Sequence, residues 1–221
     1  MSLPRSQHIA VKAGSVEYLS FGDPDSAETA VLLHASATGA PMLAGLAERL
    51  AKGCRVLVPN LDGYGATKID CPKCPATFRH VQTVERFLHA LKIDDIHLIG
   101  HSMGGLIALR VARRARFRLK SLTLIEPMAF GTLDREADGE AIAYDRTMIM
   151  DFLDAVEAGR LEEGISIFTE RVSHQKWTDL SERVQGELLA VLPQIVAEAP
   201  LVSCDDLAAP DLMGIDAATL L

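Results

Sequence analysis

Ile-His-Leu-Ile-Gly-His-Ser-Met-Gly-Gly, residues 96–105, is the stretch that most restricts the fold of this chain. Its first four residues form a bounded apolar run of the buried-strand type, and residues 106–115 continue at helical spacing. A serine on a sharp turn from strand to helix needs very small residues two positions away, and Gly100 and Gly104 satisfy this. The pattern predicts a nucleophile at Ser102; the alternative is a glycine-bounded turn with a solvated serine.

Two earlier segments place loops after strands in the same way. The apolar run 30–34 ends in His-Ala-Ser, residues 34–36, and the run 55–59 leads into Asn-Leu-Asp-Gly-Tyr-Gly, residues 60–65. With the turn at 100–104, these loops stand in the order found in α/β-hydrolases, and the chain resembles that family from about residue 7 to its last residue.

Three residues depart from the family pattern. Ala35 replaces a glycine of the first loop, and Asn60 and Asp62 replace an acid and an arginine of the second. The geometry of these two loops is therefore less well predicted than the fold.

The spacing of apolar residues predicts an α/β fold with a mostly parallel central sheet and helices on both faces. Strands and helices alternate strictly through the first half of the chain, which is the pattern of a parallel sheet covered on both sides. The expected strands lie at residues 7–12, 16–21, 30–34, 55–59, 95–100 and 120–125, and the expected helices near residues 41–52, 77–92 and 103–115.

After Pro127 the pattern changes to amphipathic helices with no strand between them, at residues 140–159, 161–174 and 180–198. The resemblance implies a helical cap that covers the nucleophile and shapes the substrate pocket. Some apolar cap residues could line that pocket, although each is also typical of a helical core: Met148, Met150, Phe152, Phe168 and Trp177. The predicted domains are a core at 1–127, a cap at 128–205 and a return to the core at 206–221.

The last residues resemble the approach to the seventh strand of the family's sheet. The resemblance implies that a complete member continues with the rest of that strand, a helix, an eighth strand, a loop with the catalytic histidine and a final helix. In this fold the triad follows the order Ser, acid, His. We therefore expect a truncated sheet and no triad histidine within the 221 residues.

Each of the seven histidines is expected to have a structural role first. The resemblance implies that His34 lies in the oxyanion loop, where it braces the backbone, and the turn is expected to direct the His101 side chain away from the nucleophile. The other histidines lie in the expected hairpin, an outer helix, the strand before Ser102 and the cap: His8, His80, His89, His97 and His174.

Glu126 is the candidate triad acid. It follows the sixth expected strand, a position that some family members use for this acid, and a carboxylate at the C-terminal end of a strand faces the rim of the site. A structural role at the strand end is the alternative. The expected oxyanion hole consists of the backbone N–H groups of Met103, at a helix N-terminus, and of Ser36.

Composition disfavours two classes of partner, nucleic acids and anionic membranes. A net charge of −8 disfavours nucleic acid and anionic membranes, and the one basic cluster, at residues 110–120, is expected to be a solvated face. Neither a signal peptide nor a membrane span is predicted, so a cytoplasmic location is expected. We expect no cofactor and no metal.

The four cysteines are Cys54, Cys71, Cys74 and Cys204. Cys71-Pro-Lys-Cys74 is a single C-x-x-C, too little for a zinc site, and it is not expected to open a helix after a strand as a redox motif does. Free thiols are the prediction.

Three interpretations of function stay open. The first, favoured here, is a serine hydrolase of an ester or similar acyl bond in a small molecule. The second is a non-catalytic relative that binds a small molecule under the cap. The third is an inactive truncated or split chain, for which exposed apolar surface predicts self-association. The sequence does not identify the substrate or its binding residues.

Overall fold

The computed structural model describes residues 4–203 and 206–221. The chain divides into two compact units: unit 1 contains Met1–Ala129 and Ala209–Leu221, and unit 2 contains Phe130–Ala208. The boundaries after residues 127 and 205 stay predictions. Cys204, one of the predicted free thiols, lies outside the described residues.

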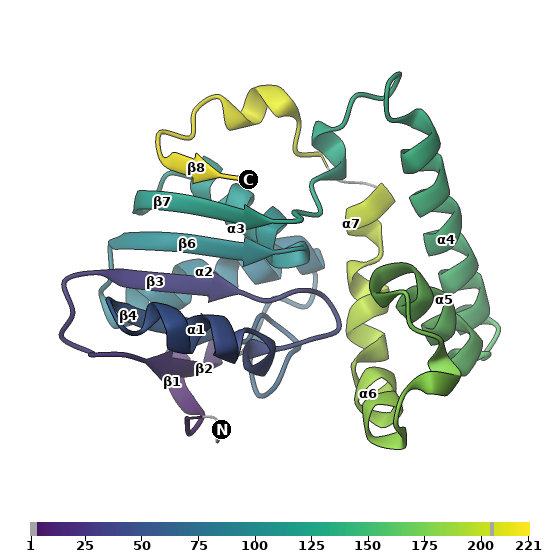
Figure 1. Cartoon of the computed structure of the whole chain (residues 1–221), viewed down its shortest axis with the longest axis horizontal. Coiled ribbons are helices and arrows are strands. Elements are labelled where there is room, and N and C mark those ends of the chain that lie inside the picture. Colours follow the sequence, from purple (N-terminus) through teal and green to yellow (C-terminus); the bar gives the residue numbers. More distant parts are fainter. Residues whose placement is uncertain (1–3, 204–205) are drawn as a thin grey trace. The chain divides into compact units, whose positions relative to one another are not determined.

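Unit 1 is built on an eight-stranded sheet with the order β1-β2-β4-β3-β6-β7-β8, and β5 pairs with β2 (Figure 1). Along the order β4-β3-β6-β7-β8 each strand pairs parallel with the next. The strand β2 pairs antiparallel with β1, β4 and β5. The strands are β1 Gln7–Val11, β2 Gly14–Phe21, β3 Thr29–Leu33, β4 Arg55–Pro59, β5 Lys68–Ile69, β6 Asp95–His101, β7 Arg118–Ile125 and β8 Ala218–Leu220. The α/β architecture is as predicted, and the short β5 was missed.

Helices cover both faces of this sheet, with α1 on one side and α2 and α3 on the other (Figure 1). All five residues of β3 are buried, as an apolar strand between two helical layers requires. The predicted helix at 41–52 begins as a 3-10 turn, where Pro41 occupies the first turn, and the helix predicted to reach residue 115 ends at Arg113. The helical elements are η1 Ala40–Leu43, α1 Ala44–Leu50, α2 Ala76–Leu91, α3 Met103–Arg113 and η4 Ala209–Leu212.

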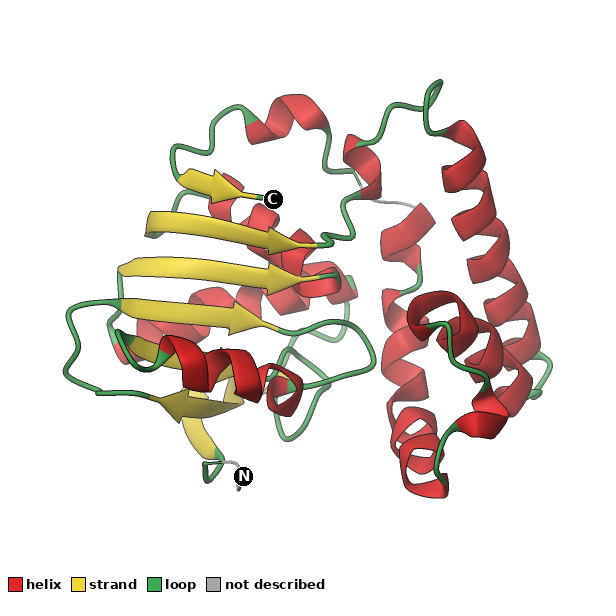
Figure 2. Ribbon diagram, in the orientation of Figure 1, coloured by secondary structure: helices red, strands yellow, loops and turns green. Residues whose placement is uncertain are grey.

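Unit 2 consists of helices and loops among its described residues, as Figure 2 shows. Phe152 on α4 and Phe168 on α5 are buried with ring centroids 6.0 Å apart, so both form the core of this unit. The elements are η2 Phe130–Thr132, α4 Gly139–Glu157, α5 Leu161–Ser173, η3 Trp177–Asp179, α6 Glu182–Glu198 and α7 Pro200–Ser203. Across the described ranges of the chain, we found no helix with the length and apolar character that crossing a membrane demands.

The prediction of free thiols is wrong for Cys71 and Cys74, because the structure joins them in a disulfide. A tight turn, in which the Cys74 N–H donates to the Cys71 carbonyl at 3.0 Å, brings their Cα atoms to 5.4 Å. The pair lies in the turn between β5 and α2, and α2 begins only at Ala76, after its N-cap Pro75, so the pair does not open the helix. Cys54 is free.

The basic cluster at the end of α3 takes part in ion pairs rather than facing water alone. Arg114 and Arg116 both contact the buried carboxylate of Glu85, at 2.5 and 3.3 Å, and Arg113 contacts Asp211 at 2.7 Å. These contacts hold α3 against α2 and against the segment that precedes β8. The basic residues therefore serve the packing of unit 1.

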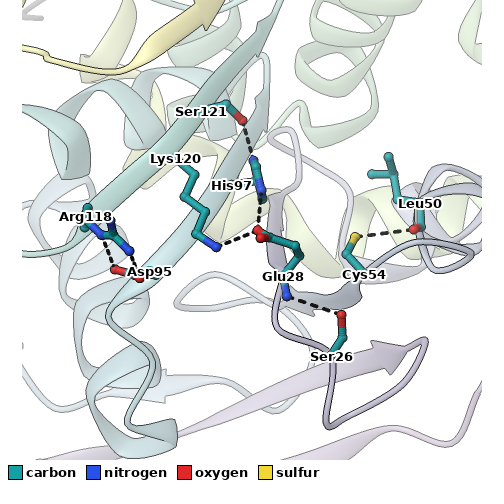
Figure 3. Close-up of polar contacts among 9 residues, drawn as sticks. All are labelled: Ser26, Glu28, Leu50, Cys54, Asp95, His97, Arg118, Lys120 and Ser121. Carbon is teal, nitrogen blue, oxygen red and sulfur yellow. Dashed lines mark hydrogen bonds and ion pairs between the residues drawn. The ribbon is translucent and has the colours of Figure 1, made fainter.

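A polar network connects three strands in their amino-terminal halves (Figure 3). Ser102 follows the carboxyl end of β6, so the network lies toward the other end of the strands. His97 on β6 contacts Ser121 on β7 through Nδ1 at 2.8 Å and Glu28 through Nε2 at 3.0 Å. Lys120 donates to the same Glu28 carboxylate at 2.7 Å. Glu28 directly precedes β3, so its carboxylate links the start of β3 to β6 and β7.

This network predicts an acid-sensitive contribution to stability. Hydrogen bonds from Lys120 and His97 hold the pKa of the Glu28 carboxyl below its ordinary value. A lowered pKa in the folded state stabilises the protein above the unfolded-state pKa, and this stabilisation is lost as the pH falls through the folded-state pKa. We expect Glu28→Gln to lower the Tm by a few degrees at pH 7 and progressively less below about pH 4.

Thermal unfolding between pH 3 and pH 7 measures this effect. Asp25→Asn is the matched control, because this exposed carboxylate lies in the same loop without an ion pair in the described structure. A Tm difference between Glu28→Gln and the parent that stays constant over the whole range would contradict the expectation.

Candidate active site

Ser102 lies on a sharp turn between the last residue of β6 and the first residue of α3. Its backbone angles are φ 53° and ψ −117°, a conformation that residues other than glycine rarely adopt. Strain of this kind persists only where the surrounding structure enforces it, and it is concentrated at functional sites. The strand and the helix that the sequence predicts on either side of Ser102 are both present.

The glycines around Ser102 leave no room for a larger residue. A Cβ atom on Gly100 would collide with the backbone of Gly104, and one on Gly104 would collide with the carbonyl oxygen of Leu33 at the end of β3. A Cβ on Gly105 would lie 2.9 Å from the Cα of Pro127. The first turn of α3 thus packs directly on the backbone of the neighbouring strand ends, which only glycine allows.

Hydrogen bonds fix the turn to the end of β7. The Ser102 N–H donates to the carbonyl of Ile125 at 2.9 Å, and the Met128 N–H donates to the carbonyl of Ser102 at 3.0 Å. The segment that contains Glu126 is therefore held beside the serine by backbone contacts on both sides.

His34 braces the loop that follows β3, as its position in the sequence suggests. Its side chain is fully buried, and its Nε2 accepts a hydrogen bond from the Leu61 N–H at 3.0 Å. The proton therefore resides on Nδ1, which donates to the Ala35 carbonyl at 2.8 Å. With both ring nitrogens engaged, this histidine positions backbone rather than a substrate.

Tyr64 is a residue of this site that sequence reasoning missed. Its side chain is 1% exposed, its hydroxyl accepts a hydrogen bond from the Ala37 N–H at 2.9 Å, and its ring packs edge-on against His34. Ser36, whose backbone N–H is a predicted oxyanion donor, lies in the chain between His34 and Ala37, and contacts with Tyr64 hold both of these residues. A tyrosine among the glycines of the 60–65 loop was the only signal in the sequence.

The departures from the family pattern in the second loop are compatible with an ordered loop. The Asn60 side chain accepts from the Ala40 N–H at 2.8 Å and donates to Glu17 at 3.0 Å, which joins three segments of unit 1. Asp62 accepts from the Ile69 N–H at 2.7 Å. Both side chains anchor backbone.

Met103 begins α3, so its N–H belongs to the first turn, whose N–H groups have no partner within the helix. Because the turn at 102–105 packs on the ends of β3 and β7, the first turn of α3 and the loop at 34–38 lie at the same end of the strands. This is the carboxyl end of the parallel strands, where ligands bind in open α/β sheets.

Glu126 follows β7 with a positive φ of 46°, and its side chain is 86% exposed. Its carboxylate lies 3.7 Å from Nε2 of His101, the residue before the candidate nucleophile. The other ring nitrogen of His101 is buried without a hydrogen-bond partner among the described residues. The structure thus places both Glu126 and His101 beside Ser102.

No imidazole hydrogen-bonds to the Ser102 hydroxyl among the residues that the structure describes. His97 belongs to the network toward the other end of the strands, His80 is buried in α2, and His8 and His89 are exposed on β1 and α2. His174 lies in unit 2. Within the described ranges, no group of three His, Cys, Asp or Glu side chains is arranged to hold a metal ion.

Comparison with known proteins agrees with this geometry. The model of the alpha/beta hydrolase family matches residues 30–221, which is most of the chain. The chain belongs to this family. The alpha/beta hydrolase fold predicted from the three loops is therefore confirmed.

Individual relatives of this alpha/beta hydrolase include a 2-hydroxy-6-oxo-2,4-heptadienoate hydrolase of Pseudomonas putida, 26% identical over 76% of this chain and 69% of the relative. A haloalkane dehalogenase of Mesorhizobium japonicum is 28% identical over 56% of this chain and 39% of the relative. The solved structure of a proposed lipase from Acinetobacter baumannii superposes with a TM-score of 0.71 at 20% identity, covering 98% of this chain and 73% of that one. The alpha/beta hydrolase chain spans less than half the length of several curated relatives that it matches.

Proposed function

We propose that the protein is a serine hydrolase that cleaves an ester or similar acyl bond of a small molecule. The observation that carries the proposal is the left-handed backbone of Ser102 at the turn from β6 to α3. This conformation presents the serine oxygen at the carboxyl end of the parallel strands. Relatives named as hydrolases support the reaction class. Because the residue at this turn is Ser102, we propose serine as the nucleophile.

In the proposed reaction, Ser102 Oγ attacks the carbonyl carbon of the substrate and its proton passes to an imidazole. The backbone N–H groups of Met103 and Ser36 stabilise the negative charge that develops on the carbonyl oxygen. His34 and Tyr64 serve this step indirectly, because their hydrogen bonds hold the loop that carries Ser36. The leaving group takes the proton, and water then releases the acyl group from the serine.

We further propose that the imidazole comes from chain beyond residue 221. The support is geometric. Both ring nitrogens of His34 contact backbone groups, and His97 lies toward the amino end of β6, away from Ser102. The strand β8 lies at the edge of the sheet with all three side chains exposed, so further chain could pair with it. The same edge supports a second proposal, that the 221-residue chain self-associates.

Glu126 is the proposed triad acid. Backbone hydrogen bonds on both sides of it fix the segment beside Ser102, and its exposed carboxylate leaves oxygen atoms available to orient an incoming imidazole. The proposed partners are a bound small molecule and, for the 221-residue chain, a second copy of itself. The cytoplasmic location stays a prediction.

We expect Glu126→Gln to lower kcat for p-nitrophenyl acetate by roughly 10⁴ in the longest natural form, because the amide no longer holds the required tautomer of the histidine. Steady-state hydrolysis measures this, with Glu136→Gln as the matched control on an exposed loop of unit 2. A loss below tenfold with intact folding assigns Glu126 a structural role. Absence of hydrolysis in the parent protein would overturn the proposed function itself.

A further inference from the structure

The disulfide between Cys71 and Cys74 is the feature of unit 1 that the proposed reaction does not use. Both residues are half-buried, and they close a four-residue turn between β5 and α2. Cys74 directly precedes Pro75, the N-cap of the sixteen-residue helix α2. A thiolate at a helix N-terminus is stabilised by the helix dipole, which favours reversible opening of such a disulfide.

Arg79 connects this turn to the loop at 60–67. Its Nη1 donates to the Cys74 carbonyl at 2.5 Å, and its Nε donates to Asp62 at 2.6 Å. The other oxygen of Asp62 accepts from the Ile69 N–H on β5 at 2.7 Å. The Arg79 and Asp62 side chains are largely buried, at 18% and 9% exposed, so water competes little for these contacts.

The loop at 60–67 in turn holds the loop that carries the proposed oxyanion donor. Leu61, next to Asp62, donates its N–H to His34, and Tyr64 accepts from the Ala37 N–H. Ser36 lies between His34 and Ala37. A continuous series of hydrogen bonds and short chain segments therefore runs from the disulfide to Ser36.

We propose that Cys71 and Cys74 form a redox-active dithiol–disulfide site whose state sets the position of the Ser36 N–H and thereby the rate of acylation at Ser102. The inference rests on the proposed function. A dithiol reductant is the reagent class. Its first thiolate attacks one sulfur of the pair, which breaks the Cys71–Cys74 bond and forms a mixed disulfide. Its second thiol then attacks the reductant's own sulfur in that mixed disulfide and releases the remaining cysteine. The reductant leaves as a disulfide, and its two hydrogens end on Cys71 and Cys74.

Reduction removes the covalent closure of the turn, so the Cys74 carbonyl is no longer held at the guanidinium of Arg79. Asp62 then loses the fixed position of its partner, and the 60–67 loop gains freedom. Small displacements of catalytic groups reduce rates strongly, and loss of an oxyanion donor costs 10² to 10³. Because displacement is milder than loss, we expect reduction to slow acylation about tenfold.

The test uses the longest natural form, because the proposed base lies beyond residue 221, and compares its oxidised state with the state reduced by dithiothreitol. Amide hydrogen exchange is followed at residues 34–38 and 60–67, and the rate of Ser102 labelling by a fluorophosphonate is measured in parallel. We expect exchange at Leu61 and Ala37 to be about tenfold faster after reduction and labelling to be about tenfold slower. Cys71→Ser/Cys74→Ser should behave like the reduced protein under both conditions.

Two variants locate the effect. Cys54→Ser should keep the full response, because Cys54 donates to the Leu50 carbonyl away from this turn, and burial together with the nearby Glu28 raises the pKa of its thiol. Arg79→Gln should give fast exchange in both redox states. A redox response that survives in Arg79→Gln would overturn the proposed route through the guanidinium.

Equal exchange in the oxidised and reduced protein would overturn the redox coupling. Altered exchange with an unchanged labelling rate would overturn its effect on acylation. If Ser102 is not labelled in either state, the proposed function fails on its own, and the inferred control of acylation falls with it. The exchange comparison still decides whether the disulfide controls the loop.

Discussion

We expect Ser102→Ala to lower kcat for ester hydrolysis by about 10⁶ in the longest natural form of the protein. The nucleophile, base and acid of a triad act as a unit, so removal of the serine oxygen eliminates the acyl-enzyme route. Interactions in the oxyanion hole and substrate binding leave a residual acceleration of about 10³ to 10⁴ over water.

Steady-state turnover of p-nitrophenyl acetate measures this loss. Ser166→Ala is the control, because Ser166 lies on α5 and its hydroxyl contacts only Glu170 among the described residues. Circular dichroism verifies that the variant folds. Turnover of Ser102→Ala within tenfold of the parent would mean that another group performs the attack.

The 221-residue chain alone should hydrolyse p-nitrophenyl acetate about 10⁶ times more slowly than a C-terminally extended natural form. The reason is that the Ser102 hydroxyl has no imidazole partner in the described structure, and a serine without its base is a weak nucleophile. Acylation becomes slow and deacylation slower.

The two forms are compared at equal concentration and pH, with size-exclusion chromatography to detect self-association through the β8 edge. Comparable rates in both forms would contradict the proposed origin of the imidazole. A histidine within the 221 residues, with His34 and His174 as the first to replace, would then be the base.

The turn at Ser102 could be predicted from the sequence because its geometry depends on local residue size. Gly100 and Gly104 are required by backbone atoms that approach within a van der Waals contact, and such a requirement leaves a direct trace in the sequence. The parallel strands were predictable for a similar reason, since burial on both faces demands continuous apolar runs. β5 was missed because two residues are too short for a periodic signal.

Long-range pairings could not be predicted in this way. Arg79 and Asp62 are seventeen positions apart, and a charged pair at that separation has no pattern that distinguishes it from two solvated side chains. The same holds for Tyr64 and Ala37 and for His101 and Glu126. The disulfide was mispredicted because free thiols were inferred from the reducing conditions of the expected compartment. The turn that brings Cys71 and Cys74 together was not part of that inference.

Ser102 should be an activated nucleophile, and the residue to which a fluorophosphonate attaches shows whether it is. The longest natural form of the protein is labelled and digested, and the modified residue is located by tandem mass spectrometry, with Ser102→Ala of the same form treated in parallel. We expect a single phosphonylated residue, Ser102, and no labelling of the variant. Attachment at another residue, or equal labelling of Ser102→Ala, would contradict it.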